Sequence, residues 1–218
     1  MPLNVVKPGS QMYEFIELTW NPIRGECEHN CKYCYLKRFP VGDLRLDEKT
    51  LLDSLGSQNR IFVGSSTDMF AENVPTEWIM KVLDRCMRSN NRYLFQTKNP
   101  HRFLDFMFPE KTTLGITLES NRHYPGISNA PPPVDRTLAF GYCSLPKMVS
   151  IEPVMDFDLG IMLSWIRTLS PNFVSIGADS RFSKLPEPSK EKLLELIAEL
   201  NEVTVVRLKK NLDRIIQR

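Results

Sequence analysis

Three cysteines in one short segment are the residues of this sequence best suited to chemistry. Cys27, Cys31 and Cys34 occur in "GECEHNCKYCYL", after an apolar run, with the spacing C-x3-C-x2-C. The 218 residues hold only two other cysteines, Cys86 and Cys143. Three thiolates in one loop can bind one face of a cubic iron–sulfur cluster and leave one iron without a protein ligand. Because catalytic metal sites keep an open position and structural sites do not, this number indicates a catalytic centre.

A tetrahedral zinc site is the alternative reading of the same three thiols. Structural zinc takes four ligands, commonly in two paired motifs, and the second pair is missing from this sequence. An unpaired residue would have to supply the fourth ligand: His29, Cys86, His101, His123 or Cys143. Cys86 falls on the apolar face of an expected helix and Cys143 lies in "AFGYCSLP". We therefore interpret both cysteines as core residues.

The composition is that of an ordinary globular protein. With 42% hydrophobic and 25% charged residues, the chain can build a packed core, and its length favours a single domain over residues 1–218. No apolar stretch approaches the roughly 20 residues that span a bilayer, and the N-terminal segment lacks a basic region followed by an apolar one. We expect a cytoplasmic monomer or weak dimer without membrane contact, in which cysteines do not form disulfides.

The formal net charge of +2 gives no strong argument for a polyanionic partner. The charge is unevenly distributed, however, because the C-terminal "VVRLKKNLDRIIQR" carries five basic residues against one acidic residue. Lys37 and Arg38 add two cations directly beside the cysteines. A basic rim near a site can hold a phosphate-bearing substrate, whereas the simpler interpretation, which we favour, is a solvated helix face.

Seven short apolar runs rich in Val, Ile and Phe predict buried strands. They cover residues 15–20, 60–65, 92–98, 113–120, 147–154, 173–179 and 203–208. Apolar residues at helical spacing follow "VPTE" and "EPSK" and fill "DLGIMLSWIRTL". This alternation predicts an α/β fold with parallel strands. A complete eight-unit barrel needs about 250 residues, so we favour a partial (β/α)6 TIM-like barrel with outer helices over a full barrel or an open doubly wound sheet.

Polar residues follow nearly every predicted strand. In parallel α/β folds ligands bind at the carboxyl ends of the strands, so one rim should carry the functional side chains. These residues are Trp20, Asn21, Ser65, Ser66, Asp68, Thr97, Lys98, Glu119, Asn121, Glu152 and Asp179. We expect the cysteine loop, which follows the first strand, at the same rim.

The cysteine spacing, with Tyr33 directly before the third cysteine, resembles the signature of radical SAM (S-adenosylmethionine) enzymes. "TWNP", "CYLKR", "IFVGSSTDMF", "QTKNPHRF", "LGITLES", "SIEPVMDF" and "IGADS" together resemble a phage-associated radical SAM family of uncharacterised activity. The similarity extends from Trp20 to Asp179. "CKYCYL" is also similar to the cluster loop of spore photoproduct lyase, a DNA-repair member of the superfamily.

This resemblance implies an enzyme that holds one 4Fe-4S cluster on Cys27, Cys31 and Cys34, with S-adenosylmethionine on the open iron. In the superfamily, one electron from the reduced cluster cleaves the cofactor, and the 5′-deoxyadenosyl radical removes hydrogen from a substrate. A reductant such as flavodoxin or ferredoxin is implied as well. The lyase-like loop favours a nucleotide or nucleic acid as substrate, whereas the nearly neutral charge favours a small molecule or another protein. No residue is assigned to the reaction on the substrate.

The resemblance also maps residues onto the methionine end of the cofactor. Many members of the superfamily carry Gly-Gly-Glu after the second strand, where this sequence has "GSSTD". Ser65, Ser66 and Asp68 stand at this position, and their hydroxyl and carboxylate oxygens can accept hydrogen bonds from the methionine ammonium group.

Four further residues are expected around the cofactor. Tyr33 would pack near the adenine or shield the cluster, and Glu119 would bind the ribose hydroxyls, with a rim salt bridge as its alternative role. Lys98 would bind the methionine carboxylate or a substrate anion, the alternative being a solvated lysine before a turn. Glu152 ends an apolar strand, so it should point into the barrel mouth, need a partner there, and contact cofactor or substrate.

A non-catalytic zinc-binding module that interacts with nucleic acid is the second functional hypothesis. The basic residues after Cys34 and near the C-terminus motivate it. It predicts that nucleic-acid binding falls steeply with salt concentration.

Overall fold

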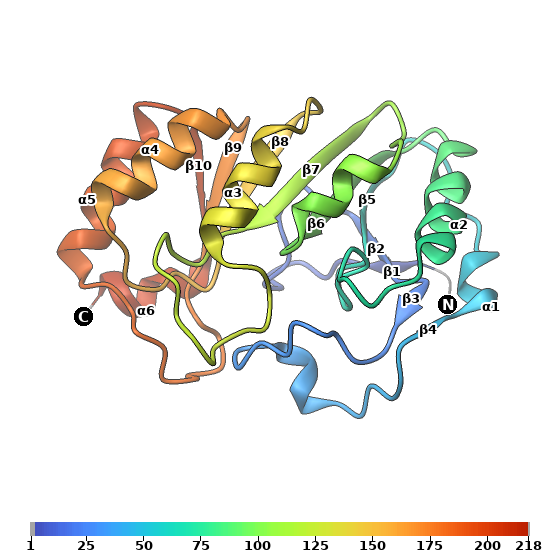
Figure 1. Ribbon diagram of the computed structural model, residues 1–218, viewed down its shortest axis with the longest axis horizontal. Coiled ribbons are helices and arrows are strands. Elements are labelled where there is room, and N and C mark those ends of the chain that lie inside the picture. The colour runs from blue at the N-terminus through green and yellow to red at the C-terminus, as the bar shows by residue number, and fades with distance from the viewer. Residues whose placement is uncertain (1–2, 218) are drawn as a thin grey trace.

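Seven parallel strands form the centre of the computed structural model, which describes residues 3–217. They are β2 (Leu18–Trp20), β5 (Arg60–Val63), β6 (Arg92–Thr97), β7 (Thr112–Thr117), β8 (Lys147–Ile151), β9 (Phe173–Ile176) and β10 (Val205–Leu208). Each pairs with the next in chain order, and β1 (Asn4–Val5) joins β2 in the antiparallel direction. Because the order runs from β1 to β10 without closing, the sheet is an open, partial barrel (Figure 1).

Helical segments connect the strands and cover the outer face of the sheet (Figure 1). The α-helices are α1 (Glu48–Leu51), α2 (Thr76–Met87), α3 (Pro133–Gly141), α4 (Leu159–Leu169), α5 (Lys190–Asn201) and α6 (Asp213–Ile216). The 3-10 helices are η1 (Tyr35–Arg38), η2 (Pro100–Asp105) and η3 (Lys210–Leu212), and β3 (Ile23–Arg24) pairs with β4 (Arg45–Leu46) in a separate ribbon. All seven predicted strands are present, so the prediction of an α/β partial barrel is confirmed.

The two faces of the sheet bury different clusters, because side chains alternate along a strand. Ile61, Val63 and Phe95 pack with the buried faces of the outer helices. Phe62 and Leu94, one position away on the same strands, point to the inner face. The outer cluster contains the predicted apolar face of α2, including the fully buried Cys86.

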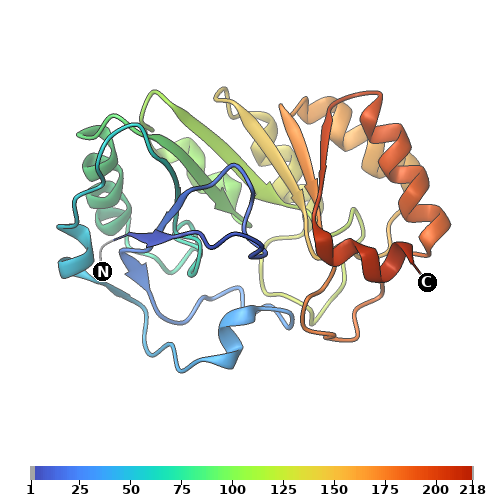
Figure 2. The same cartoon turned by 180° about the vertical axis from the view of Figure 1, so that it is seen from behind.

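The N-terminal segment fills the inner face of the barrel. Tyr13 and Ile16 pack against Phe62, Leu94 and Met148 there, and Figure 2 shows the segment crossing the sheet on the side away from the helices. The first predicted strand is therefore shorter than its apolar run. Its first two residues turn inward instead of pairing, with a backbone hydrogen bond of 3.0 Å from Ile16 N–H to the Tyr13 carbonyl.

Among residues 3–217, no helix combines the length and apolar character needed to cross a membrane.

Replacing Phe70 should test the outer core. Its fully buried ring lies 4.7 Å from the ring centre of Phe103 and 6.2 Å from that of Phe95. Phe70→Ala is expected to lower the free energy of unfolding by about 3–5 kcal/mol, because it leaves a cavity among aromatic rings. Urea denaturation measures the change. Met107→Ala, at a side chain that is 83% exposed, should stay within about 0.5 kcal/mol of the parent protein. Equal stability of the two variants would contradict this packing.

Candidate functional site

The three cysteines lie in the loop that follows β2, at the carboxyl end of the sheet. Each cysteine carbonyl accepts a hydrogen bond from the backbone N–H three residues later, at Asn30, Cys34 and Lys37, over 3.1, 3.1 and 3.2 Å. These successive turns coil the loop. Cys31 is buried, Cys27 and Cys34 are half-buried, and all three line one cavity of about 1530 Å³.

The cysteine side chains do not converge on one point. Within residues 3–217, no three His, Cys, Asp or Glu side chains stand where they could hold a single metal ion. An iron–sulfur cube asks for a different arrangement, because each thiolate binds its own iron and the three sulfur atoms stand farther apart. A loop of successive turns along a cavity wall is compatible with that arrangement.

The loop between β7 and α3 supports the cysteine loop from one side. The Cys31 sulfur lies 3.1 Å from the hydroxyl of Ser128, which also donates to the carbonyl of His29 at 3.2 Å. The backbone N–H of Lys32 donates to the carbonyl of Ile127 at 2.8 Å. These contacts join segments that are about a hundred residues apart and fix the position of Cys31.

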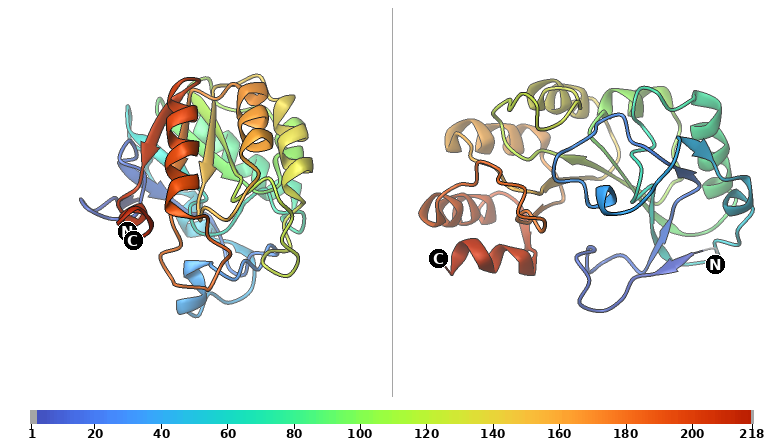
Figure 3. Two further views of the ribbon diagram at one scale, coloured as in Figure 1. Left: turned by 90° about the vertical axis from the view of Figure 1, so that its left-hand side faces the viewer. Right: turned by 90° about the horizontal axis from the view of Figure 1, so that it is seen from below.

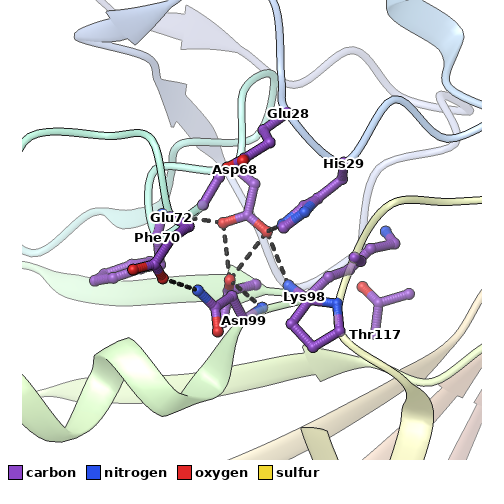
Figure 4. A network of polar contacts seen from close by, with 12 residues as sticks. Glu28, His29, Asp68, Phe70, Glu72, Lys98, Asn99 and Thr117 are labelled. Carbon is purple, nitrogen blue, oxygen red and sulfur yellow. Dashed lines mark hydrogen bonds and ion pairs between the residues drawn. The ribbon is translucent and has the colours of Figure 1, made fainter.

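The carboxylate of Asp68 supports the cysteine loop from the other side (Figure 4). It lies 2.9 Å from Nε2 of His29 and accepts hydrogen bonds from the Thr97 hydroxyl at 2.8 Å and from the backbone N–H of Lys98 and Phe70 at 2.8 and 3.0 Å. Burial by itself would raise the pKa of Asp68, but the contacts with His29, Lys98 and Thr97 outweigh it and hold the pKa below its usual value. These partners use the four acceptor positions of a carboxylate, so Asp68 joins the cysteine loop to β5 and β6.

Ser65 and Ser66 lie at the cavity wall, beside the loop after β2. Asn21 holds this turn: its side-chain oxygen accepts from the Ser65 hydroxyl at 3.2 Å and from the Ser66 backbone N–H at 2.9 Å. Both serines are half-buried and line the cavity with the cysteines. A role of Ser65 and Ser66 in binding the methionine ammonium group requires that they lie beside the cysteines at the cavity wall.

Glu119 is the centre of a buried ion-pair network. Its carboxylate lies 2.8 Å from the Arg136 guanidinium and 3.8 Å from the Lys98 ammonium, and it accepts a hydrogen bond from the Tyr33 hydroxyl. Burial would raise the pKa of Glu119, but Arg136, Lys98 and the Tyr33 hydrogen bond keep it below its usual value. Of the seven residues mapped onto the cofactor, Glu119 alone does not line the cavity and lies behind Tyr33 and Lys98. The anticipated rim salt bridge exists, but it is buried.

Lys98 is a largely buried cation beside the cysteines. Its side chain is 17% exposed, and its ammonium lies 5.5 Å from the centre of the Tyr33 ring. Burial would lower the pKa of Lys98, but the nearby Cys31 and Glu119 raise it above its usual value. The alternative role of Lys98, a solvated lysine before a turn, does not agree with this burial.

Glu152 lies across the cavity and has the partner that its burial requires. Its carboxylate is 2.5 Å from the ammonium of Lys209, and both side chains are mostly buried. Gly177 leaves room for this carboxylate, since a Cβ at that position would come within 2.7 Å of it. Lys209 lies 4.3 Å above the ring of Tyr13, whose hydroxyl is 3.0 Å from that of Ser150. This is the polar inner end of the cavity.

Several side chains of the site were not predicted. Arg136 lies in α3, and Ser128 lies in the loop before α3. Tyr13 and Lys209 lie near the two ends of the described chain. Each is defined by a partner far away in the sequence, so no local pattern marks it. The basic residues near the C-terminus were the one available signal, and only for Lys209.

Comparisons with known proteins add a family and a fold. A family model described as "Protein of unknown function (DUF5131)" matches residues 10–168. A comparison with curated proteins gives no match.

Solved structures of spore photoproduct lyase have a similar fold. One mutant of that enzyme is 14% identical with a TM-score of 0.63, over 94% of this chain and 80% of the other. A mutant with dinucleoside spore photoproduct is 16% identical with a TM-score of 0.58, over 91% and 65%. A mutant with bound AdoMet and the same dinucleoside is 15% identical with a TM-score of 0.55, over 89% and 64%. The chain thus spans four fifths of the first structure and slightly under two thirds of the other two.

Glu119→Gln should show how much the buried network matters. The substitution removes the counter-charge of Arg136, which is 4% exposed, and is expected to lower the free energy of unfolding by about 3–5 kcal/mol. Chemical denaturation of protein purified without added iron measures this effect apart from any cofactor. Glu195→Gln, on the exposed face of α5, is the matched control and should change stability by less than about 0.5 kcal/mol. Similar losses in both variants would argue against a pairing of Glu119 with Arg136.

Proposed function

We propose a radical SAM activity for this chain, which belongs to the family described as "Protein of unknown function (DUF5131)". The observation that carries the proposal is the position of Cys27, Cys31 and Cys34, spaced C-x3-C-x2-C, along the wall of a large cavity at the carboxyl end of a partial parallel barrel. A spore photoproduct lyase that has this fold binds AdoMet. Motif, fold and placement of the loop support the same function.

The residues present fit a 4Fe-4S cluster. Thiolates are the ligands such clusters take, and three of them leave one iron open. Burial and the charge of Asp68 raise the pKa of Cys27 to about 11, so this thiol stays protonated until iron displaces the proton. The Lys98 ammonium, whose charge is favoured by Cys31, would offset the negative charge of the thiolates. When bound, the cluster and S-adenosylmethionine supply a 5′-deoxyadenosyl radical that removes hydrogen from the substrate.

The cavity wall formed by the ends of β5 and β6 would hold the cofactor. Ser65 and Ser66 present hydroxyl groups that can accept from the methionine ammonium, and Lys98 presents a cation for the methionine carboxylate. Tyr33 would pack near the adenine or shield the cluster. Asp68, whose acceptor positions are used by protein donors, would serve the ammonium indirectly by keeping these groups in place.

Glu119 is assigned to the ribose hydroxyls by the resemblance alone. Its burial behind Tyr33 and Lys98, and its pairing with Arg136, support a positioning role. Through these contacts it would set the orientation of the Tyr33 ring and of the Lys98 ammonium, both of which line the cavity.

The opposite wall, at the ends of β8 and β10, would position the substrate. Glu152 and Lys209 offer an acceptor and a donor side by side, and Tyr13 and Ser150 continue the polar surface inward. Holding one substrate C–H bond in a fixed orientation is the main task left to the protein. A nucleotide or nucleic acid remains the predicted substrate class. The flavodoxin or ferredoxin donor, the phage association, the single domain, the cytoplasmic location and the monomeric or weakly dimeric state also remain predictions.

No observation favours the zinc-binding module as a second function. His29, a considered fourth ligand, faces Asp68, and Cys86 is fully buried on α2. Both positions are better explained by packing and hydrogen bonding within the described part of the chain.

Anaerobic reconstitution with iron and sulfide tests the proposal. The expected product is a brown protein with about four irons per chain, which forms 5′-deoxyadenosine when dithionite and S-adenosylmethionine are added. Cys27→Ala, Cys31→Ala and Cys34→Ala should each lose most of the iron and all of this product, because a cluster ligand is gone. Iron analysis, absorbance spectra and mass spectrometry are the measurements.

Cys143→Ala is the matched control, since Cys143 is a buried cysteine of the outer core. It should retain both the iron and the product. A colourless protein that holds one tightly bound zinc would overturn the proposal, as would full iron content in Cys31→Ala.

A further inference from the structure

Two exposed loops at the cavity mouth combine aromatic rings with cations. One is the segment after Cys34, which includes η1, and the other connects β9 to α5; Figure 3 shows both at the same end of the barrel. Together they form what we call the mouth patch: Tyr35, Lys37, Arg38, Phe39, Arg181, Phe182 and Lys184. The three aromatic residues are 50%, 60% and 73% exposed in chain order. Rings of this size seldom stay so exposed without a binding role when they gather beside a cavity.

The mouth patch is positively charged. Residues 32–39 ("KYCYLKRF") and 180–185 ("SRFSKL") contain five basic residues and no acidic residue. Two exposed acidic residues, Glu26 and Glu28, also line the cavity, and Glu28 accepts a hydrogen bond from the backbone N–H of Asn73 at 3.0 Å. Asp179, at the base of the second loop, is 3% exposed. Within the two loops of the mouth patch, the exposed charges are therefore cations.

Internal contacts fix the two loops. The Arg181 guanidinium donates to the carbonyl of Cys34, which joins the second loop to the cysteine loop. The Asp179 carboxylate accepts from the backbone N–H of Arg181 at 2.9 Å and from that of Ser183, and Phe182 between them has a left-handed φ of 55°. The turn thus holds the Phe182 ring out toward solvent, with the Arg214 guanidinium 5.4 Å from its centre.

This chemistry matches one kind of ligand. Proteins that bind single-stranded nucleic acid stack unpaired bases on exposed aromatic rings and pair the phosphates with lysine and arginine. Tyr35, Lys37, Arg38 and Phe39 also line the cavity, so a bound strand would run past its opening. A duplex keeps its base faces stacked inside and cannot use the rings. A membrane surface would use cations and rings too, but the patch rims a cavity whose wall carries Lys98, Glu152 and Lys209 rather than a continuous apolar face.

We propose that the mouth patch binds single-stranded DNA or RNA and brings one nucleotide to the cavity. Bases would stack on Phe39 and Phe182, and phosphates would pair with Lys37 and Arg38. The inference deepens the proposed function by giving the substrate class, and it rests on that function for its chemistry. Binding of the single strand requires only the mouth patch and does not require the cluster.

Fluorescence polarisation with the reconstituted 218-residue chain tests the binding. The probes are labelled single-stranded DNA and RNA of about 12 nucleotides and the matching DNA duplex. Both single strands should bind more tightly than the duplex. The single strand with the higher affinity, DNA or RNA, identifies the kind of nucleic acid that the protein binds. Phe39→Ala and Phe182→Ala should each weaken single-strand binding roughly 5- to 100-fold, because a stacking surface is lost. The Lys37→Ala/Arg38→Ala double variant should reduce the slope of log affinity against log salt by about 1.4.

Tyr142→Ala is the control, at an 80% exposed ring at the end of α3 that precedes β8, and it should bind like the parent. The proposal is overturned if the duplex binds as well as the single strands, if Phe182→Ala binds like Tyr142→Ala, or if the protein binds anionic phospholipid vesicles but no oligonucleotide.

Iron content and 5′-deoxyadenosine formation, measured on the same preparations, separate this inference from the proposed function. Protein that forms 5′-deoxyadenosine but binds no single strand refutes the mouth patch alone. Protein that binds single strands through Phe39 and Phe182 but assembles no cluster supports the patch and refutes the radical chemistry.

Discussion

The position of the cysteine loop depends on one carboxylate, that of Asp68, whose side chain is only 11% exposed. A carboxylate removed from water is stable only where donors surround it, and Asp68 has such donors from three parts of the chain. His29 belongs to the cysteine loop, Phe70 follows β5, and Thr97 and Lys98 end β6. Satisfying Asp68 therefore brings the cysteines to the carboxyl ends of these strands. The loop has little regular structure of its own, so this requirement acts in place of strand pairing.

A second buried carboxylate sets the charge of the same region. Glu119 pairs with Arg136 and with Lys98, whose ammonium lies beside Cys31, and the Asp68 carboxylate adds a second negative charge to the same wall. This arrangement is present before any ligand arrives, so the protein does not have to reorganise in order to stabilise an anionic group there. The opposite wall holds the Glu152–Lys209 pair, which is balanced by itself. The two walls thus differ in composition, because one holds two carboxylates with several partners each and the other holds a single ion pair.

Local sequence patterns predicted the strands and the residues at their carboxyl ends better than the side-chain contacts between different segments. All seven strands follow from apolar runs, and Ser65, Ser66, Lys98 and Glu152 line the cavity because parallel strands present their carboxyl ends at one rim. Trp20 did not follow that rule. It is fully buried, with its indole N–H donating to the carbonyl of Thr50 at 3.1 Å, because the chain folds back over it.

Contacts between distant segments could not be predicted in this way. Arg136 faces Glu119 because its guanidinium also donates to the carbonyl of Thr117 at the end of β7, and Ser128 reaches Cys31 because its loop crosses the rim. Neither residue has a periodic signature. The inward turn at Tyr13 was not predicted for a different reason. A short apolar run has the same sequence pattern whether its residues form a strand of the sheet or fill the inside of a barrel.

The two walls of the cavity also differ in the order in which they can be assembled. The side-chain contacts that hold Cys31, Asp68 and Glu119 come from residues up to Arg136, although the Cys34 carbonyl also accepts from Arg181. The inner end around Glu152 needs Lys209, which also donates to the carbonyl of Gln11 from 198 residues away at 2.7 Å. Closing so long a loop costs entropy that nearer contacts do not require. The wall around Cys31 therefore depends mainly on contacts that close shorter loops, while the wall proposed for the substrate is completed only when the last strand docks.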